Sequence, residues 1–223
     1  MINPHLLWEM KERHGANPLL ASAAQSGNIE VAKQLLQWGA SVKYRINDGS
    51  TPLIIAAQLG HIDMCSLLLA YDGSSVEDCG DDGFTPLRIA AESGQSDVCG
   101  LLLAHDGSIV DDTHPISGQT ALIHAASQGH HQTVKTLLSY GAAVDSADHS
   151  GMTALHFACQ EGQLSCVLSV IEAGANVTLP DKRGLQPLHW AARKDRAAIV
   201  RVLLDHGCDK EMVSIFIFIV AVP

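Results

Sequence analysis

The sequence predicts an all-α fold built from stacked repeats, and two glycine series indicate it. The first series recurs at intervals of 33 to 35 residues and consists of Gly27, Gly60, Gly94, Gly129 and Gly162. The second recurs at intervals of 33 or 34 residues and consists of Gly39, Gly73, Gly107, Gly141, Gly174 and Gly207. A fixed period of this length is typical of proteins whose repeats bury their apolar faces against one another.

Each repeat is predicted to begin with a turn and a first helix. The phrase Asp-Gly-Ser-Thr-Pro-Leu, which starts at Asp48, returns with changes at Asp82, Ser117, Ser150 and Arg183. Its glycine tolerates the positive φ of a turn. A threonine hydroxyl then caps the helix, at Thr51, Thr85, Thr120 and Thr153. Proline at the first helical position, as in Pro52 and Pro86, loses little because its missing N–H would be unpaired there.

A second helix is predicted after each glycine of the first series. Residues 31–36 and 62–69 carry apolar side chains at helical spacing. Each such segment ends before a glycine of the second series, which is a helix-stop signal. Two short helices and a turn therefore form one unit.

Together these features resemble the ankyrin repeat over roughly residues 14–210. The matching family phrase is Asp-x-x-Gly-x-Thr-Pro-Leu-His-x-Ala-Ala-x-x-Gly-His, followed by an outer helix ending Leu-Leu-x-x-Gly-Ala. The resemblance implies an all-α ankyrin-repeat solenoid of helix–turn–helix units joined by β-hairpin-like loops. The predicted domains are a lead-in helix (1–13), a repeat domain (14–211) and an apolar tail (212–223). The repeats are placed at 14–46, 47–80, 81–115, 116–148, 149–181 and 182–211.

The first and last repeats depart from the family phrase. Repeat one has Pro18 in the threonine position, which suits an N-terminal capping unit. Repeat six has Gln186 in that position and Asp195 in place of the glycine that links its helices. We expect repeat six to be either looser than the others or a cap.

Composition excludes several classes of protein. A formal net charge of −10 argues against a general nucleic-acid binder. The longest apolar run, residues 215–222, is far shorter than the roughly 20 residues of a membrane helix, and no signal peptide is recognisable. The six cysteines form no Cys-x-x-Cys pair, and all except Cys79 occupy apolar helix or glycine-flanking positions. We therefore expect reduced thiols, an exposed Cys79 and a cytoplasmic or nuclear protein.

The sequence also argues against catalysis. It contains neither a phosphate-binding Gly-Lys-Ser loop nor a Gly-x-Ser-x-Gly elbow. His61, His130, His156 and His189 stand at positions where the family phrase has histidine. We expect no enzyme activity, no cofactor and no metal.

The resemblance implies that a partner protein binds the hairpin tips and the concave face of the first helices. The expected binding residues are Asp48, Ser50, Leu59, Asp81, Phe84, Glu92, Gln119, Gln128, Met152, Phe157, Glu161, Leu185, Trp190 and Arg193. Phe84, Met152 and Leu185 form an exposed apolar patch, or each folds onto its neighbouring hairpin.

One first-helix position carries Ile55, Ile89, His124, Phe157 and Trp190. Packing between repeats is the favoured interpretation for the two isoleucines. Trp190, expected to be half-exposed, is the best candidate anchor, because aromatic residues dominate binding hot spots.

Charge is unevenly distributed along the chain. Residues 46–112 contain twelve acids and one base, Arg88, whereas residues 181–201 contain six bases and two acids. The acidic segment would steer a partner with a basic segment to repeats two and three, or it serves mainly as a solvated surface that keeps the protein soluble.

The expected function is protein–protein recognition by a monomeric adaptor or scaffold that binds neither nucleic acid nor membrane. The alternative is a targeting or substrate-recognition fragment of a larger enzyme, such as a kinase or a ubiquitin-ligase subunit. The uncharged tail is β-prone and would promote aggregation if exposed. We interpret it as a read-through product of an intron donor, with a hydrophobic lid over the last repeat as the rival interpretation.

Overall fold

The computed structural model describes residues 9, 15–71 and 76–209. Three sequence-based expectations fall on other residues: the lead-in helix apart from Glu9, the turn at Gly73 and the apolar tail. These expectations lie outside the described residues.

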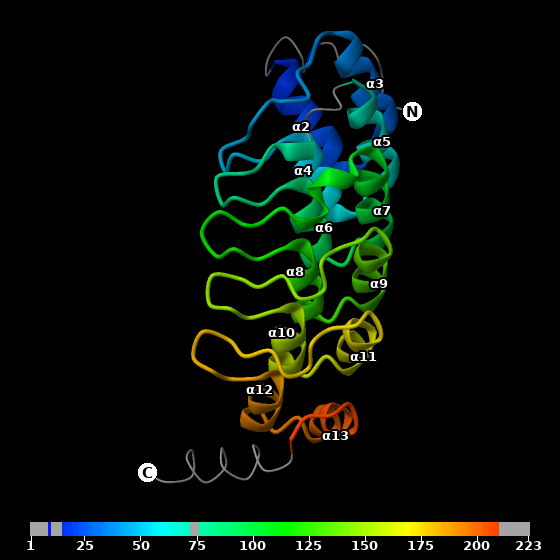
Figure 1. Ribbon diagram of the computed structural model, residues 1–223. Coiled ribbons are helices and arrows are strands. Elements are labelled where there is room, and N and C mark those ends of the chain that lie inside the picture. Colours follow the sequence, from blue (N-terminus) through cyan, green and yellow to red (C-terminus); the bar gives the residue numbers. More distant parts are fainter. Residues whose placement is uncertain (1–8, 10–14, 72–75, 210–223) are drawn as a thin grey trace. The chain divides into compact units, whose positions relative to one another are not determined.

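The regular elements of the described residues are all helices, as the repeat pattern predicts, and they follow one another in pairs (Figure 1). The first helices are α2 (Ala16–Ser26), α4 (Pro52–Leu59), α6 (Pro86–Glu92), α8 (Ala121–Gln128), α10 (Ala154–Glu161) and α12 (Pro187–Arg193). The second helices are α3 (Ile29–Gln37), α5 (Ile62–Tyr71), α7 (Ser96–His105), α9 (His131–Ser139), α11 (Leu164–Glu172) and α13 (Ala197–Asp205). A short 3₁₀ helix, η2 (Gly107–Asp111), follows α7.

The chain divides into two compact units, Met1–Ile109 and Val110–Pro223. In the first unit α4 contacts α2 and α6, while α5 contacts α3 and α7. In the second unit α10 contacts α8 and α12, while α11 contacts α9 and α13. Helices of the same kind therefore stack within each unit, and every first helix also packs on its own second helix.

The threonine caps form as predicted. Thr51 Oγ1 accepts the N–H of Ile54 at 3.3 Å, and Thr85 and Thr120 cap α6 and α8 in the same way. In α10, Nδ1 of His156 accepts the N–H of Thr153 at 3.1 Å. Repeat one differs, because α2 already begins at Ala16 and contains Pro18 in its first turn.

Hairpins precede the first helices from α4 onwards, and each is closed by a backbone bond between two residues that are four or five positions apart. The N–H to oxygen pairs are Ile46 to Ser50, Gly80 to Phe84, His114 to Gln119, Asp148 to Met152 and Asp181 to Leu185, at 2.8 to 3.0 Å. Neighbouring tips within a unit are also joined: Asp81 donates to Asp48, His149 to Ser117 and Lys182 to Ser150. In the second unit the hairpins extend to the same side of the helices (Figure 1).

This ladder of tips requires a residue without a side chain at Gly151. Its φ is +83°, and a Cβ there would lie 2.8 Å from the backbone nitrogen of Lys182. The tips can therefore approach closely enough to bond only because the turn residue is glycine.

Repeat six keeps the helix–helix link without a glycine. Asp195 has φ 54°, the left-handed conformation that glycine adopts at Gly129 and Gly162 in the two preceding repeats. α12 still contacts α13. Asp195 therefore bears the strain of this conformation, which aspartate tolerates better than most residues.

Five of the six cysteines are buried, as their positions in the repeat predicted, but Cys79 is half-buried and not exposed as expected. All six are free thiols. Burial raises the pKa of Cys65 and of Cys99 to about 12. These thiols are core-filling groups with almost no thiolate at neutral pH.

Candidate functional site

The hairpin tips of the first unit carry Asp48, Ser50, Asp81 and Phe84. Asp48 and Asp81 are exposed, whereas Ser50 and Phe84 are half-buried. Asp48 Oδ1 accepts the N–H of Ser50 at 2.9 Å, and hydrogen bonds from the Ser50 backbone and hydroxyl lower the pKa of the Asp48 carboxyl. Asp48 therefore shapes its own turn as well as presenting a charge to solvent.

The first helices of this unit add Leu59 and Glu92 to the surface. Leu59, the last residue of α4, is 46% exposed, and Glu92, the last residue of α6, is half-buried. Leu59 is thus an exposed apolar side chain at the end of a first helix.

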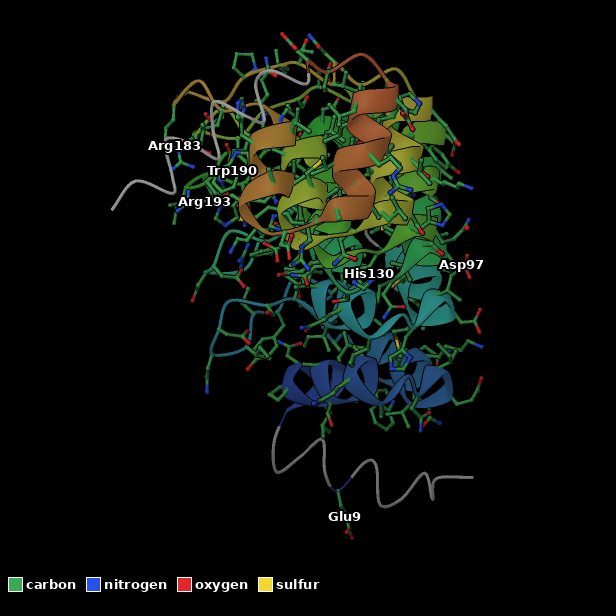
Figure 2. All side chains as sticks on the ribbon, turned by 90° about the horizontal axis from the view of Figure 1, so that it is seen from below. Glu9, Asp97, His130, Arg183, Trp190 and Arg193 are labelled. Carbon is green, nitrogen blue, oxygen red and sulfur yellow. The ribbon has the colours of Figure 1, made fainter. Side chains whose placement is uncertain are left out.

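The acidic segment contains a single base, Arg88, which is buried and donates to the carbonyl oxygen of Gly83. Arg45, just before the segment, donates to the carbonyl oxygens of Gly49 and Cys79 and lies 3.6 Å from an oxygen of Asp78. Asp97 (Figure 2) is exposed, as are other acids of the segment. The described surface of this segment is therefore negative.

In the second unit, the aromatic position of the first helices carries His124, Phe157 and Trp190. His124 and Phe157 are half-buried, but Trp190 is only 7% exposed. The expectation of a half-exposed Trp190 is wrong, because the indole edge is bonded to Asp181 and two guanidinium groups lie over the ring.

Met152 is also placed differently from the expectation. Its side chain is 6% exposed, because its backbone N–H and carbonyl are both bonded to Asp148 and hold the residue in the closed hairpin. Leu185 is half-buried in the next hairpin. The expected patch of three exposed apolar tips therefore does not form, because Met152 is buried and Phe84 and Leu185 are half-buried. The alternative, that each side chain folds onto its neighbouring hairpin, stays a prediction.

The remaining expected residues of this unit are polar. Gln119 is half-buried at its tip, whereas Gln128 and Glu161 are exposed as the last residues of α8 and α10. Glu161 accepts a hydrogen bond from the Gln160 amide at 2.7 Å. α8 and α10 thus end in an exposed amide and an exposed carboxylate.

Asp181 organises the hairpin before α12. Its Oδ1 accepts the N–H groups of Arg183 at 2.8 Å and Leu185 at 2.9 Å, and its Oδ2 accepts the indole N–H of Trp190 at 3.2 Å. Burial alone would raise the pKa of the Asp181 carboxyl, but these bonds and the Arg183 guanidinium lower it below its usual value. The carboxylate is therefore charged and accepts three hydrogen bonds from within the chain.

Two arginines flank the indole. The guanidinium carbon of Arg183 lies 4.8 Å from the Trp190 ring centroid, and that of Arg193 lies 5.8 Å from it. Figure 2 shows the three residues together, with Arg183 from the hairpin tip and the other two from α12. Of this cluster, Trp190 and Arg193 were predicted as binding residues, and Arg183 and Asp181 were not.

The histidines of the family phrase have structural surroundings. His156 is fully buried, and its Nε2 lies 3.2 Å from the carbonyl oxygen of Leu185 in the next hairpin. Burial lowers the pKa of His156 and of His189. Both side chains accept the N–H of the residue that caps their own helix, Thr153 and Gln186 respectively. Among the described residues no three His, Cys, Asp or Glu side chains gather where they could hold a metal ion.

The geometry defines a class of repeat protein in which a constant helical frame presents variable side chains at hairpin tips and helix ends. A sequence model of ankyrin repeats in three copies matches residues 20–114 and 107–181, and a single ankyrin repeat matches residues 183–214. The chain belongs to the ankyrin repeat family. Ankyrin repeats are generally protein–protein interaction modules, and their fold is typically non-catalytic.

Solved structures support the same assignment. The crystal structure of the human ASB11 ankyrin repeat domain is similar to this chain with a TM-score of 0.77 and 27% sequence identity, covering 85% of this chain and 84% of that one. Because 590 chains of known structure match, the structural similarity supports the family assignment but does not indicate which partner this chain binds. No curated protein sequence matches the chain significantly. No helix in the described ranges is both long and apolar enough to cross a membrane.

Proposed function

We propose that this chain is a non-catalytic recognition module, an adaptor or scaffold, which binds a partner protein through its hairpin tips and first helices. One observation carries the proposal. The last residues of α8, α10 and α12 are Gln128, Glu161 and Arg193, all exposed and all chemically different. They belong to helices that stack in order, so they offer an amide, a carboxylate and a guanidinium along one row.

The contrast with the core supports this reading. The leucines at the second position of the same three helices are Leu122, Leu155 and Leu188, each 1% exposed. Packing requires the same residue at these positions, whereas the helix ends carry exposed groups that differ from one repeat to the next. Variable polar groups on a constant frame are what specific recognition needs, because specificity is a difference of affinities between partners.

The test is affinity capture from cell lysate with two matched variants. Glu161→Arg changes the last residue of the first helix α10, and Glu172→Arg makes the same change at the last residue of the second helix α11. Both side chains are exposed, so we expect both variants to remain folded, which circular dichroism would check.

We expect bound proteins that the wild type and Glu172→Arg capture equally and that Glu161→Arg loses. Binding lost with Glu172→Arg alone would move the interface to the second helices and contradict the proposal. A wild-type chain that captures no protein above the background of a scrambled control would contradict recognition itself. Substitutions of Met152 and Trp190 are unsuitable here, because truncating these buried side chains would destabilise the stack.

A substrate-recognition part of a larger enzyme would use the same residues. The matched variants therefore test recognition in either setting.

A further inference from the structure

The residues Arg183, Trp190 and Arg193, which we call the arginine clamp, carry an inference about the chemistry of the partner. Trp190 is a fixed platform, since it is 7% exposed and its N–H is held by Asp181. Both guanidinium carbons lie within 5.8 Å of its ring centroid. Cations over an indole face are attracted by the ring quadrupole, so the two arginines are partly ordered before any ligand arrives.

The clamp retains unused capacity to donate hydrogen bonds. Asp181 is occupied by two backbone N–H groups and the indole, and its contact with Arg183 Nε is 3.7 Å, longer than a hydrogen bond. The Arg183 side chain is 59% exposed. Among the described residues no ion pair is found for Arg193, which is also exposed. A guanidinium in this state can form a bidentate pair with an oxyanion.

The surroundings add positive charge and some apolar surface. Lys182 and Lys194 are exposed beside the two arginines in sequence, and the Lys182 ammonium is anchored to the carbonyl oxygen of His149 at 2.8 Å. Two apolar side chains nearby are half-buried. Phe157 lies on α10, which packs beside α12, and Leu185 lies in the hairpin that Asp181 closes. The elements that carry the clamp therefore also carry two exposed lysines and adjoin two partly exposed apolar side chains.

We propose that the arginine clamp binds the carboxylates of an acidic protein segment in which glutamate or aspartate alternates with apolar residues. The inference rests on the proposed function and specifies its partner. One feature favours a protein segment over a nucleic acid. The net charge of −10 opposes every anionic ligand, but it opposes an extended phosphate backbone more than a short segment that carries only a few carboxylates.

The experiment uses the full chain and a fluorescent synthetic peptide in which Glu alternates with Leu and Ser. A second peptide has Gln in place of every Glu. The test variant is Arg183→Gln/Arg193→Gln. Its control is Lys135→Gln/Arg201→Gln, which removes the same two charges from exposed positions on α9 and α13. Thermal unfolding checks that both variants are folded, and Arg183→Lys/Arg193→Lys provides a version that keeps the charge of the clamp.

We expect the Glu peptide to bind the wild type and the control with similar Kd, and the Arg→Gln variant about tenfold more weakly or worse. The Lys variant should bind with intermediate affinity because it lacks the bidentate fork. Equal binding of the Glu and Gln peptides, equal weakening in the control, or no binding of the Glu peptide at about 1 mM would overturn the proposal. Tighter binding of a single-stranded DNA oligonucleotide than of the Glu peptide would also overturn it.

The same variants distinguish a failure of this inference from a failure of the proposed function. Glu161→Arg can reduce lysate capture while the Glu peptide binds the clamp variant and the wild type equally. In that case the proposed function is supported and the proposal of an acidic partner is wrong. If neither experiment shows binding, both the proposed function and the acidic partner are wrong.

Discussion

The indole N–H of Trp190 donates to Oδ2 of Asp181 at 3.2 Å, which ties the hairpin tip of the last repeat to its first helix. The same carboxylate also holds the backbone of Arg183 and Leu185. Together with the guanidinium groups of Arg183 and Arg193, which lie over the ring, this bond explains why Trp190 is buried and is not the half-exposed anchor that the sequence predicted.

We expect Asp181→Asn to destabilise the protein by about 1 to 3 kcal/mol at pH 7, because three donors lose a charged acceptor. The pKa of the Asp181 carboxyl is lower in the folded than in the unfolded chain. The stabilisation is therefore present above the unfolded pKa of about 3.9 and is lost as the pH falls through the folded pKa. Urea unfolding of both proteins between pH 7 and pH 3 should show the difference shrinking with acid. A difference independent of pH would assign the effect to packing.

The sequence predicted the helices and turns well, because they depend on local caps, prolines and glycines that recur in each repeat. The Thr51, Thr85 and Thr120 caps and the prolines at the start of α4 and α6 appear where the phrase placed them. Gly129 and Gly162 end their helices in the left-handed conformation. The early start of α2 was not predicted, because Pro18 was aligned to a threonine position that the helix does not use as its cap.

The candidate site was predicted less well, because exposure depends on contacts between distant residues. The repeat pattern places Met152 at a turn but does not show that Asp148 folds the turn inward. Likewise it gives no sign that Asp181 reaches Trp190. A usable signal for Arg183 was present: the segment Asp-Lys-Arg-Gly puts two bases in the hairpin before a helix that ends in Arg193.

Acid should weaken the fold through His156. Burial lowers its pKa in the folded state, although the nearby carbonyl of Leu185 and the carboxylates of Asp181 and Asp148 oppose this. The unfolded chain, with an ordinary His pKa of about 6.5, therefore binds the proton first, and stability falls as the pH drops below that value. We expect a slope of at most about 1.4 kcal/mol per pH unit from this residue.

The comparison is between wild type and His156→Gln, unfolded by urea at pH 5 and pH 7.5. The variant should lose part of the acid-induced destabilisation, and the remainder should come from His189, whose pKa is also lowered by burial. An unchanged pH dependence in the variant would show that His156 is not the titrating group.

Two turn glycines should differ in their tolerance of a methyl group. Gly151→Ala places a Cβ 2.8 Å from the backbone nitrogen of Lys182, whereas Gly184→Ala meets nothing within 4 Å. Both residues have positive φ, so both substitutions cost about 1 to 2 kcal/mol from conformation alone. Gly151→Ala should cost roughly 1 to 3 kcal/mol more, because the tip ladder must open. Equal losses in thermal unfolding would mean that the approach of neighbouring tips contributes little.

The thiols should react in two classes. Cys79 is half-buried, whereas the other five are buried and burial raises the pKa of each. At pH 8 we expect a thiol reagent to modify one cysteine quickly in the native chain and all six after denaturation. Cys79→Ser should abolish the fast class. Fast modification of Cys65 or Cys99, identified by mass spectrometry, would contradict the buried placement.

The most direct test of recognition by the first helices is site-specific photo-crosslinking in cells. A photoreactive amino acid is placed at Gln128, the last residue of α8, or at Ser139, the last residue of α9, both of which are exposed. Our account predicts a discrete crosslinked protein from position 128 and none, or a much weaker one, from position 139. A partner crosslinked from position 139 and absent from position 128 would contradict it.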